Sequence, residues 1–268
     1  MPPGRKGYHQ SIIRTFVLLL IACIAGAATL VLDVRTGRVL FEDTAGTVSA
    51  APGSVLKPFV AIALLETSTF RPAQRVACAR QLQLKGRKFD CSHPALAMPL
   101  DLSAALAYSC NNYFVTMSRR LEPVRLAAGL QRFGLNAEVA GTADQLAMQA
   151  IGQWGIECTP AELAAAYRRL ALFRRTAGAR YVPLWSGIAG AAEFGTAQLA
   201  KPAGLRIAGK TGTTLNRSRT ETLGWFAGWA PVGTPEFVAV VLARGSGGPD
   251  AAPEARRAFE RFAARGVH

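Results

Sequence analysis

Ser54 and Lys57 stand three positions apart, directly after Pro52-Gly53 and at the start of an apolar stretch, Val55–Thr67. The apolar density predicts a buried helix, on which positions i and i+3 share a face. A serine hydroxyl needs a base to become a nucleophile, and a lysine becomes that base when burial or a neighbouring cation lowers its pKa. The helix N-terminus adds N–H groups where an oxyanion would form. By itself, however, the pair is more typical of a serine that caps a helix, followed by a solvated lysine.

Two further polar motifs follow along the chain. Ser109-Cys110-Asn111 lies in a stretch with a helical pattern and places a hydroxyl and an amide one residue apart. Lys210-Thr211-Gly212-Thr213 precedes a strand-like segment, Trp225–Trp229, and offers a cation and two hydroxyls beside a glycine that permits close approach of a ligand. Each motif alone is also typical of a capping pair or of an exposed hairpin edge.

In this order the three motifs resemble the Ser-x-x-Lys, Ser-x-Asn and Lys-Thr-Gly signature of penicillin-binding proteins and serine β-lactamases. Ser109 follows Ser54 by 55 positions, and Lys210 follows Ser109 by 101. Each motif falls on the kind of element that its role requires: a helix start, an inter-lobe helix and a sheet strand. Similarity to penicillin-binding transpeptidase domains extends over residues 29–245, and it is carried by the segments Val31–Gly37, Ala51–Phe59, Tyr108–Phe114, Ile151–Gln153, Thr159-Pro160, Gly209–Thr214 and Trp225–Pro231.

The resemblance implies a set of catalytic roles. Ser54 would attack a D-Ala-D-Ala amide or a β-lactam carbonyl and form an acyl-enzyme, and Lys57 would take its proton. Ser109 would relay a proton to the leaving amine, between Lys57 and Lys210, whose two charges would lower each other's pKa. No cofactor is expected.

The resemblance also implies a substrate-binding set. Asn111 would hydrogen-bond the side-chain amide of the substrate. Lys210, Thr211 and Thr213, on one strand with Gly212, would bind its terminal carboxylate. The backbone N–H groups of Ser54 and Thr213 would form the oxyanion hole. The expected ligands are peptidoglycan stem peptides and β-lactams.

The order of elements predicts an α+β fold of two lobes with a cleft between them. Strand material at both chain ends would form one antiparallel sheet flanked by helices, with an all-α lobe inserted. The predicted α/β lobe covers about residues 28–75 and 204–268, and the α lobe about 76–203. The predicted strands are 29–34, 38–42, 204–208, 222–230 and 236–243, and the predicted helices are 55–67, 102–121, 123–133, 160–172 and 252–264.

Departures from the family leave three functions open. Large transpeptidases carry an N-terminal pedestal or a glycosyltransferase domain, whereas 53 residues precede Ser54 in this sequence. Class A β-lactamases carry Glu and, four residues later, Asn; here Asn136 precedes Glu138 and Thr142 stands in the later position. Class D enzymes carry an aliphatic residue where Asn111 stands. The favoured function is a D,D-transpeptidase or D,D-carboxypeptidase; the alternatives are a serine β-lactamase and a β-lactam- or wall-sensing module without turnover.

Residues 1–27 predict export, because a basic start with Arg5, Lys6 and Arg14 precedes an apolar run. Three interpretations of this segment are open: a signal peptide cleaved near Ala28, which is favoured; a lipoprotein signal with Cys23 as the lipidated residue; and an uncleaved signal anchor. The expected location is therefore extracytoplasmic, in the periplasm or on the outer face of the cytoplasmic membrane. The N-terminus would associate the protein with the membrane.

Composition narrows the class of protein. The 268 residues are 50% hydrophobic and 18% charged, which excludes disorder for most of the chain. Lys and Arg total 31 against 17 Asp and Glu, and this net charge of +14 favours anionic partners. Because the chain carries an export signal and no nucleic-acid motif, anionic lipid or wall polymer is expected rather than nucleic acid. A cell-wall synthesis protein is a further expected partner.

The sequence allows two interpretations of Cys78 and Cys91. Cys78 and Cys91 flank a stretch suited to a tight loop, Leu84–Arg87, and an oxidising compartment would let them form a disulfide. The alternative is two unpaired thiols. Cys110 and Cys158 are expected to be small buried apolar residues. No metal site is predicted, because the three histidines are scattered and no C-x-x-C or H-x-x-x-H spacing occurs.

Overall fold

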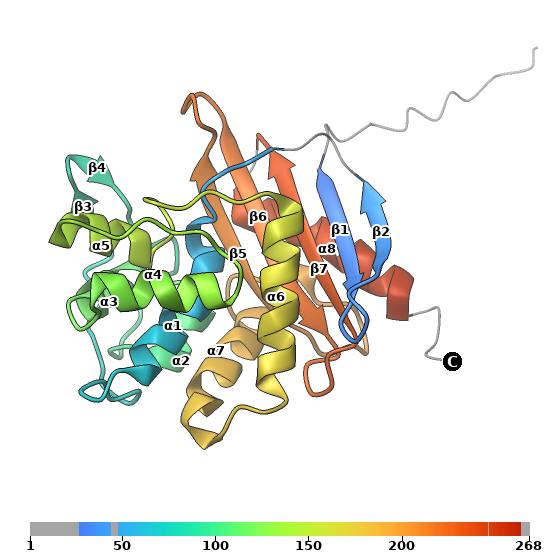
Figure 1. Ribbon diagram of the computed structural model, residues 1–268, viewed down its shortest axis with the longest axis horizontal. Helices are drawn as coiled ribbons and strands as arrows, with labels where there is room; N and C mark the ends of the chain where they lie inside the picture. The colour runs from blue at the N-terminus through green and yellow to red at the C-terminus, as the bar shows by residue number, and fades with distance from the viewer. Residues whose placement is uncertain (1–26, 44–47, 246, 264–268) are drawn as a thin grey trace, which may run out of the picture.

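The computed structural model describes residues 27–43, 48–245 and 247–263. Its centre is a five-stranded antiparallel sheet with the strand order β2-β1-β7-β6-β5 (Figure 1). The two ends of the chain meet in this sheet, because β1 pairs with β7 along its whole length. This confirms the predicted α+β fold. The strands are β1 (Ala28–Asp33), β2 (Val39–Asp43), β5 (Ala208–Leu215), β6 (Thr222–Ala230) and β7 (Phe237–Arg244).

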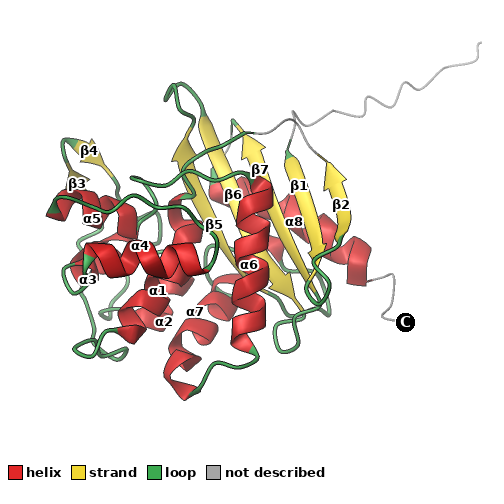
Figure 2. Cartoon of the chain, in the orientation of Figure 1, coloured by secondary structure: helices red, strands yellow, loops and turns green. Residues whose placement is uncertain are grey.

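Helices cover both faces of the sheet (Figure 2). On one face lies α8 (Gly248–Ala263), which packs against β6 and β7. On the other face lie α6 (Pro160–Arg174) and α7 (Val182–Glu193). The remaining helices are α1 (Lys57–Glu66), α2 (Leu102–Ala107), α3 (Asn111–Ser118), α4 (Pro123–Arg132) and α5 (Ala143–Ala150), with 3₁₀ turns η1 (Gly53–Leu56), η2 (Ala179–Tyr181) and η3 (Gln198–Ala200).

The interior strand β6 shows how the sheet divides the core. Successive side chains of a strand point to opposite faces. Trp225 and Trp229 therefore enter the core beneath α6 and α7, whereas Phe226 meets Phe259 of α8. Trp225 also donates its indole N–H to the Ala51 carbonyl at 3.0 Å, which ties the segment before the turn η1 to the sheet.

The predicted helix over residues 102–121 is wrong in one respect. The chain leaves the helix after α2 and starts a new one at α3, and Ser109 between them adopts φ +58°. Such a conformation costs a non-glycine residue about 1–3 kcal/mol, so the surrounding contacts must hold it. The helical spacing of apolar residues continues across the break, which is why the sequence does not reveal it.

Other differences concern buried or short elements. Helices α5 and α7 were not predicted. Helix α7 packs between the sheet and α2, so it is apolar on most of its surface and lacks the polar face of an amphipathic helix. The strand predicted at 204–208 instead begins at Ala208 and contains the Lys-Thr-Gly motif. The tight loop predicted at Leu84–Arg87 is confirmed as a hairpin between β3 (Gln83–Leu84) and β4 (Arg87–Lys88).

Residues 1–26 lie outside the described part of the chain, and with them the predicted export segment and Cys23. Among the helices that the structure describes, none is both long and apolar enough to span a bilayer. The division of the chain into an α/β lobe and an α lobe at residues 76 and 203 stays a prediction. Helices α6 and α7, which the prediction assigns to the α lobe, pack directly on the sheet.

Candidate active site

Ser54 and Lys57 lie on one turn at the entrance to α1. Ser54 is inside the 3₁₀ turn η1 and Lys57 is the first residue of α1. Side chains three positions apart eclipse one another in 3₁₀ geometry, so both project to the same side. The Lys57 side chain is fully buried, whereas Ser54 is partly exposed and lines a cavity.

Three glycines let this turn pack directly against its neighbours, the edge strand β5 and the backbone at Gly152. Gly53 adopts φ +55°, and a Cβ there would lie 2.6 Å from the Thr213 carbonyl oxygen. A Cβ on Gly212 would lie 2.7 Å from the Pro52 oxygen, and one on Gly152 would lie 2.0 Å from the Gly53 oxygen. Gly53 also donates its N–H to the Gly152 carbonyl at 2.9 Å. Backbone packing without side chains therefore places the turn that carries Ser54 and Lys57 beside Thr213.

Two buried lysines converge on the Ser109 hydroxyl. The Lys210 amine, on β5, donates to Ser109 Oγ at 2.8 Å, and the Lys57 amine lies 3.4 Å from the same oxygen. Lys57 Nζ also donates to the Ser109 carbonyl at 2.8 Å and to Asn111 Oδ1 at 2.6 Å. The strained turn at Ser109 thus places its carbonyl, its hydroxyl and the Asn111 side chain within hydrogen-bond reach of the lysine amines.

Burial changes the acidity of both amines. It lowers the pKa of Lys57 from its ordinary value of 10.5 to about 8, against a smaller opposing effect of the nearby Cys110, Cys91 and Cys78. Burial, followed by the positive charge of Lys57, holds the pKa of Lys210 well below its usual range. Two ammonium groups around one hydroxyl repel each other, so the pair readily gives up a proton near neutral pH.

The hydrogen bonds of Lys57 show what its neutral form can do. A neutral amine has two N–H groups and one lone pair. The Ser109 carbonyl and Asn111 Oδ1 accept the two N–H groups, so the lone pair is not needed for either contact. In its neutral form the Lys57 amine can therefore accept a proton from a neighbouring hydroxyl, such as that of Ser109, whose Oγ lies 3.4 Å away.

The expected substrate-binding residues are distributed around one cavity of about 270 Å³. Thr213 is exposed, and its Oγ1 accepts the Gly248 N–H at 2.8 Å, so its own O–H stays available. Thr211 donates its hydroxyl to Thr196 at 2.8 Å. Asn111 donates Nδ2 to the Phe89 carbonyl at 2.8 Å and keeps a second N–H. The cavity is lined by Ser54, Phe89, Asp90, Ser92, Ser109, Asn111, Ile151, Gln153, Thr196, Thr211, Gly212, Thr213 and Pro249.

The structure thus brings all eight predicted site residues into one region and adds others. Gln153 donates its side-chain amide to the Thr213 carbonyl at 2.9 Å, across 60 positions of sequence. Thr196 and Phe89 were not expected in the site, because neither stands in a motif. Of these three residues, only Gln153 had a signal in the sequence, because it lies in the segment Ile151–Gln153 that resembles transpeptidase domains.

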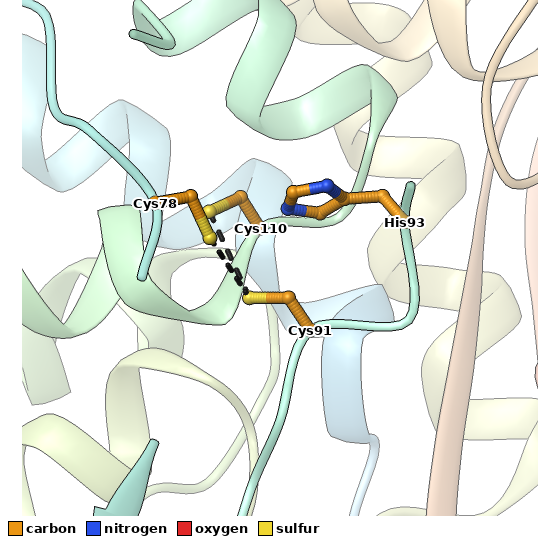
Figure 3. Close-up of side chains that lie close together, drawn as sticks. All are labelled: Cys78, Cys91, His93 and Cys110. Atoms are coloured by element: carbon orange, nitrogen blue, oxygen red, sulfur yellow. Dashed lines mark hydrogen bonds between the residues drawn. The ribbon is translucent and has the colours of Figure 1, made fainter. Parts of the chain in front are cut away.

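The predicted disulfide between Cys78 and Cys91 is not formed in the structure. Both are free thiols, and their sulfurs lie 3.5 Å apart, well beyond the bond length of about 2.05 Å. A third sulfur, that of Cys110, lies 3.8 Å from Cys91, and His93 faces the group (Figure 3). The prediction of no metal site therefore overlooked a cluster of four ligand-type residues. Its one local signal was the Cys91-x-His93 spacing.

The structure combines an antiparallel sheet, helices on both of its faces and a serine–lysine turn packed on the edge strand β5. The family model for the penicillin-binding protein transpeptidase domain matches residues 27–174 and 187–260. Because this match spans most of the chain, the protein belongs to that family. No curated protein sequence matches the chain at a significant level.

Solved structures share the fold at low sequence identity. Pseudomonas aeruginosa PBP2 in complex with WCK 5153 superposes with TM-score 0.75 at 19% identity, over 88% of this chain and 73% of that one. Helicobacter pylori PBP2, in complex with MreC, gives 0.78 at 16%, over 90% and 60%. The transpeptidase domain of the FtsI4 D,D-transpeptidase from Legionella pneumophila gives 0.66 at 23%, over 88% of each.

Proposed function

We propose that the protein is a peptidoglycan D,D-transpeptidase or D,D-carboxypeptidase that works through an acyl-enzyme on Ser54 and is acylated by β-lactams. The observation that carries the proposal is the pair of buried amines, Lys57 and Lys210, converging on Ser109 Oγ beside the cavity that Ser54 lines. Family membership supports the reaction class. The similar structures include one named as a D,D-transpeptidase and one determined in complex with WCK 5153.

In the acylation step, Ser54 Oγ adds to the carbonyl carbon of the penultimate D-Ala while neutral Lys57 takes the hydroxyl proton. The tetrahedral intermediate collapses by breaking the C–N bond. Ser109 Oγ gives its proton to the departing nitrogen and recovers one from the lysine pair. Free D-Ala leaves, and the acyl group stays on Ser54 as an ester. With a β-lactam the amine remains tethered to the acyl group.

The oxyanion of the intermediate needs donors beside Ser54. We assign this role to the backbone N–H groups of Ser54 and Thr213. The contact of Gly53 with the Thr213 backbone supports the assignment, because it brings the nucleophile turn and the edge strand together. One such donor is worth roughly 3 kcal/mol in comparable acyl-transfer enzymes.

The second half-reaction distinguishes the candidate functions. An amine acceptor forms a cross-link, whereas water releases the acyl group. A β-lactamase needs a general base for that water. Among the described residues lining the cavity, Asp90 is the one carboxylate, and its Oδ1 already accepts the Leu82 N–H. Glu138 does not line it. This arrangement favours a long-lived acyl-enzyme over fast hydrolysis of β-lactams.

The proposed setting is extracytoplasmic, with peptidoglycan stem peptides as substrates and the basic surface toward anionic lipid or wall polymer. The predicted N-terminal export segment supports this location. A cell-wall synthesis protein is proposed as a partner, because the Helicobacter pylori relative was solved in complex with MreC. Protease accessibility in intact and permeabilised cells would test the location, since a cytoplasmic protein is cleaved only after permeabilisation of the inner membrane.

A pulse of fluorescent penicillin followed by a chase with unlabelled drug tests the function. We expect a covalent label that lasts many minutes in the unaltered protein and in Ser218→Ala, a serine variant in an exposed loop, and no label in Ser54→Ala. A label lost within seconds as the drug is hydrolysed would indicate a β-lactamase. No label on folded protein would favour a sensing module. Release of D-Ala from a stem peptide, with and without an amine acceptor, then separates carboxypeptidase from transpeptidase.

A further inference from the structure

Four side chains outside the proposed catalytic set point at one another. The sulfurs of Cys78, Cys91 and Cys110 and a ring nitrogen of His93 all lie within 4.8 Å of one another (Figure 3). Cys91 Sγ is 3.5 Å from Cys78 Sγ and 3.8 Å from Cys110 Sγ. Two thiolates bound at about 2.3 Å to one tetrahedral ion lie about 3.8 Å apart. The observed spacing therefore matches the edges of a metal-centred tetrahedron better than a disulfide.

The hydrogen bond of His93 defines which nitrogen is free. Nδ1 lies 2.8 Å from the Pro94 carbonyl, which can only accept, so Nδ1 carries the proton. Nε2 is then an unprotonated lone pair. His93 is only 3% exposed, and its buried Nε2 has no hydrogen-bond partner. Metal-bound histidines typically donate their other ring N–H to a carbonyl in this way.

Backbone N–H groups face the sulfurs. Cys78 Sγ accepts the Arg80 N–H at 3.3 Å, and Cys110 Sγ accepts the Tyr113 N–H at 3.4 Å as the N-cap of α3. Cys91, His93 and Cys110 are buried, whereas Cys78 is half-buried at the surface. The cluster is thus closed toward the core and open to entry of an ion beside Cys78.

We propose that Cys78, Cys91, His93 and Cys110 bind one Zn²⁺ in a closed tetrahedral site. Three thiolates and one imidazole nitrogen form a ligand set typical of structural zinc, and soft thiolates disfavour Mg²⁺ and Ca²⁺. All four positions are filled by protein, so the ion would have a structural rather than a catalytic role. This site goes beyond the proposed acyl transfer and does not depend on it.

The place of the site in the fold gives the ion a positioning role. Cys110 is the middle residue of the Ser109-Cys110-Asn111 motif, next to the strained φ +58° of Ser109. Cys91 lies two residues after Phe89, whose carbonyl accepts the Asn111 amide. Zn²⁺ would therefore join the segment 76–94, which forms one wall of the cavity, to the turn that aims Ser109 at both lysines.

Metal content tests the site directly. The full chain, purified with a reductant and without chelators, is expected to hold about one zinc per chain by elemental mass spectrometry. Cys78→Ala and His93→Ala are expected to lose it, and Cys158→Ala, a buried cysteine outside the cluster, to keep it. Co²⁺ added to the demetallated wild type should give the visible bands and thiolate charge transfer of a tetrahedral site. Absence of both metal and bands, or an intact-mass disulfide among the three cysteines without metal, would overturn the proposal.

Acylation by penicillin tests the positioning role, and this readout rests on the proposed function. Removal of zinc from the wild type is expected to lower the acylation rate constant about tenfold with the drug's dissociation constant little changed, and added Zn²⁺ to restore it. Near-ultraviolet circular dichroism monitors whether the fold persists. An unchanged rate in a chain shown to bind and lose zinc would overturn the positioning role. If wild-type zinc protein fails to label at all, the proposed function fails while the metal site stands on its content.

Discussion

The acylation rate should follow the titration of the buried Lys57. Burial lowers the pKa of this amine from 10.5 to about 8, with Lys210 on β5 and the thiols of Cys110, Cys91 and Cys78 as its charged or titratable neighbours. A shift of this size raises the neutral fraction near pH 7 by about 300-fold relative to a solvated lysine. In the proposed mechanism, Lys57 acts as the base only when its amine is neutral. The rate is therefore expected to rise about tenfold between pH 6 and pH 7, and to level off above about pH 8.

Stopped-flow measurement of the second-order acylation constant with fluorescent penicillin, at constant ionic strength from about pH 6 to about pH 10, would check this expectation. Lys201→Met serves as the matched control, because Lys201 is a partly exposed lysine paired with Glu193 and should leave the midpoint unchanged. Parallel samples without protein correct for hydrolysis of the drug. A rate that is flat across the range, or that still rises at pH 10, would refute the assignment of a buried, neutral Lys57 as base.

Three substitutions extend the test. Ser109→Ala removes the hydroxyl shared by the two lysines, and we expect labelling by fluorescent penicillin to slow by about 10²–10⁴-fold, the range for general acid–base groups; an unchanged labelling rate would exclude Ser109 from the proton path. Gly53→Ala forces a Cβ to within 2.6 Å of the Thr213 oxygen at φ +55°, so labelling should be lost in protein that circular dichroism shows to be folded. Thr159→Ala breaks the capping box with Glu162 at the start of α6 and should cost about 1 kcal/mol in denaturant unfolding, with labelling retained.

The extent of sequence prediction differs between the motifs and their surroundings. Ser54 and Lys57 could be placed together because three positions on one helical turn is a local relation. Lys210 could be assigned to the site only through the resemblance, since nothing local joins β5 to α1. Gly53 and Gly152 were not recognised as site residues, because their role is to let two distant backbone segments touch. The break at Ser109 was missed because apolar spacing continues through it.

The cysteines illustrate the same limit. The spacing of Cys78 and Cys91 indicated a loop that brings two thiols together, and the hairpin of β3 and β4 does so. The sequence could not show that Cys110, 19 residues further on, would place a third sulfur beside them. Because a third thiol and an unprotonated imidazole nitrogen are also present, a prediction that considers only the pair Cys78 and Cys91 does not describe the site.

The sequence by itself determined the family, the α+β class and which groups are proposed to react, because these depend on residue types, short spacings and order along the chain. Tertiary structure alone decided the acidity of Lys57 and Lys210, the strained turn at Ser109 and the cysteine–histidine cluster. Acidity depends on burial and on charges brought from distant segments, and a ligand set depends on distances between side chains. Both are set when the sheet and the helices pack together.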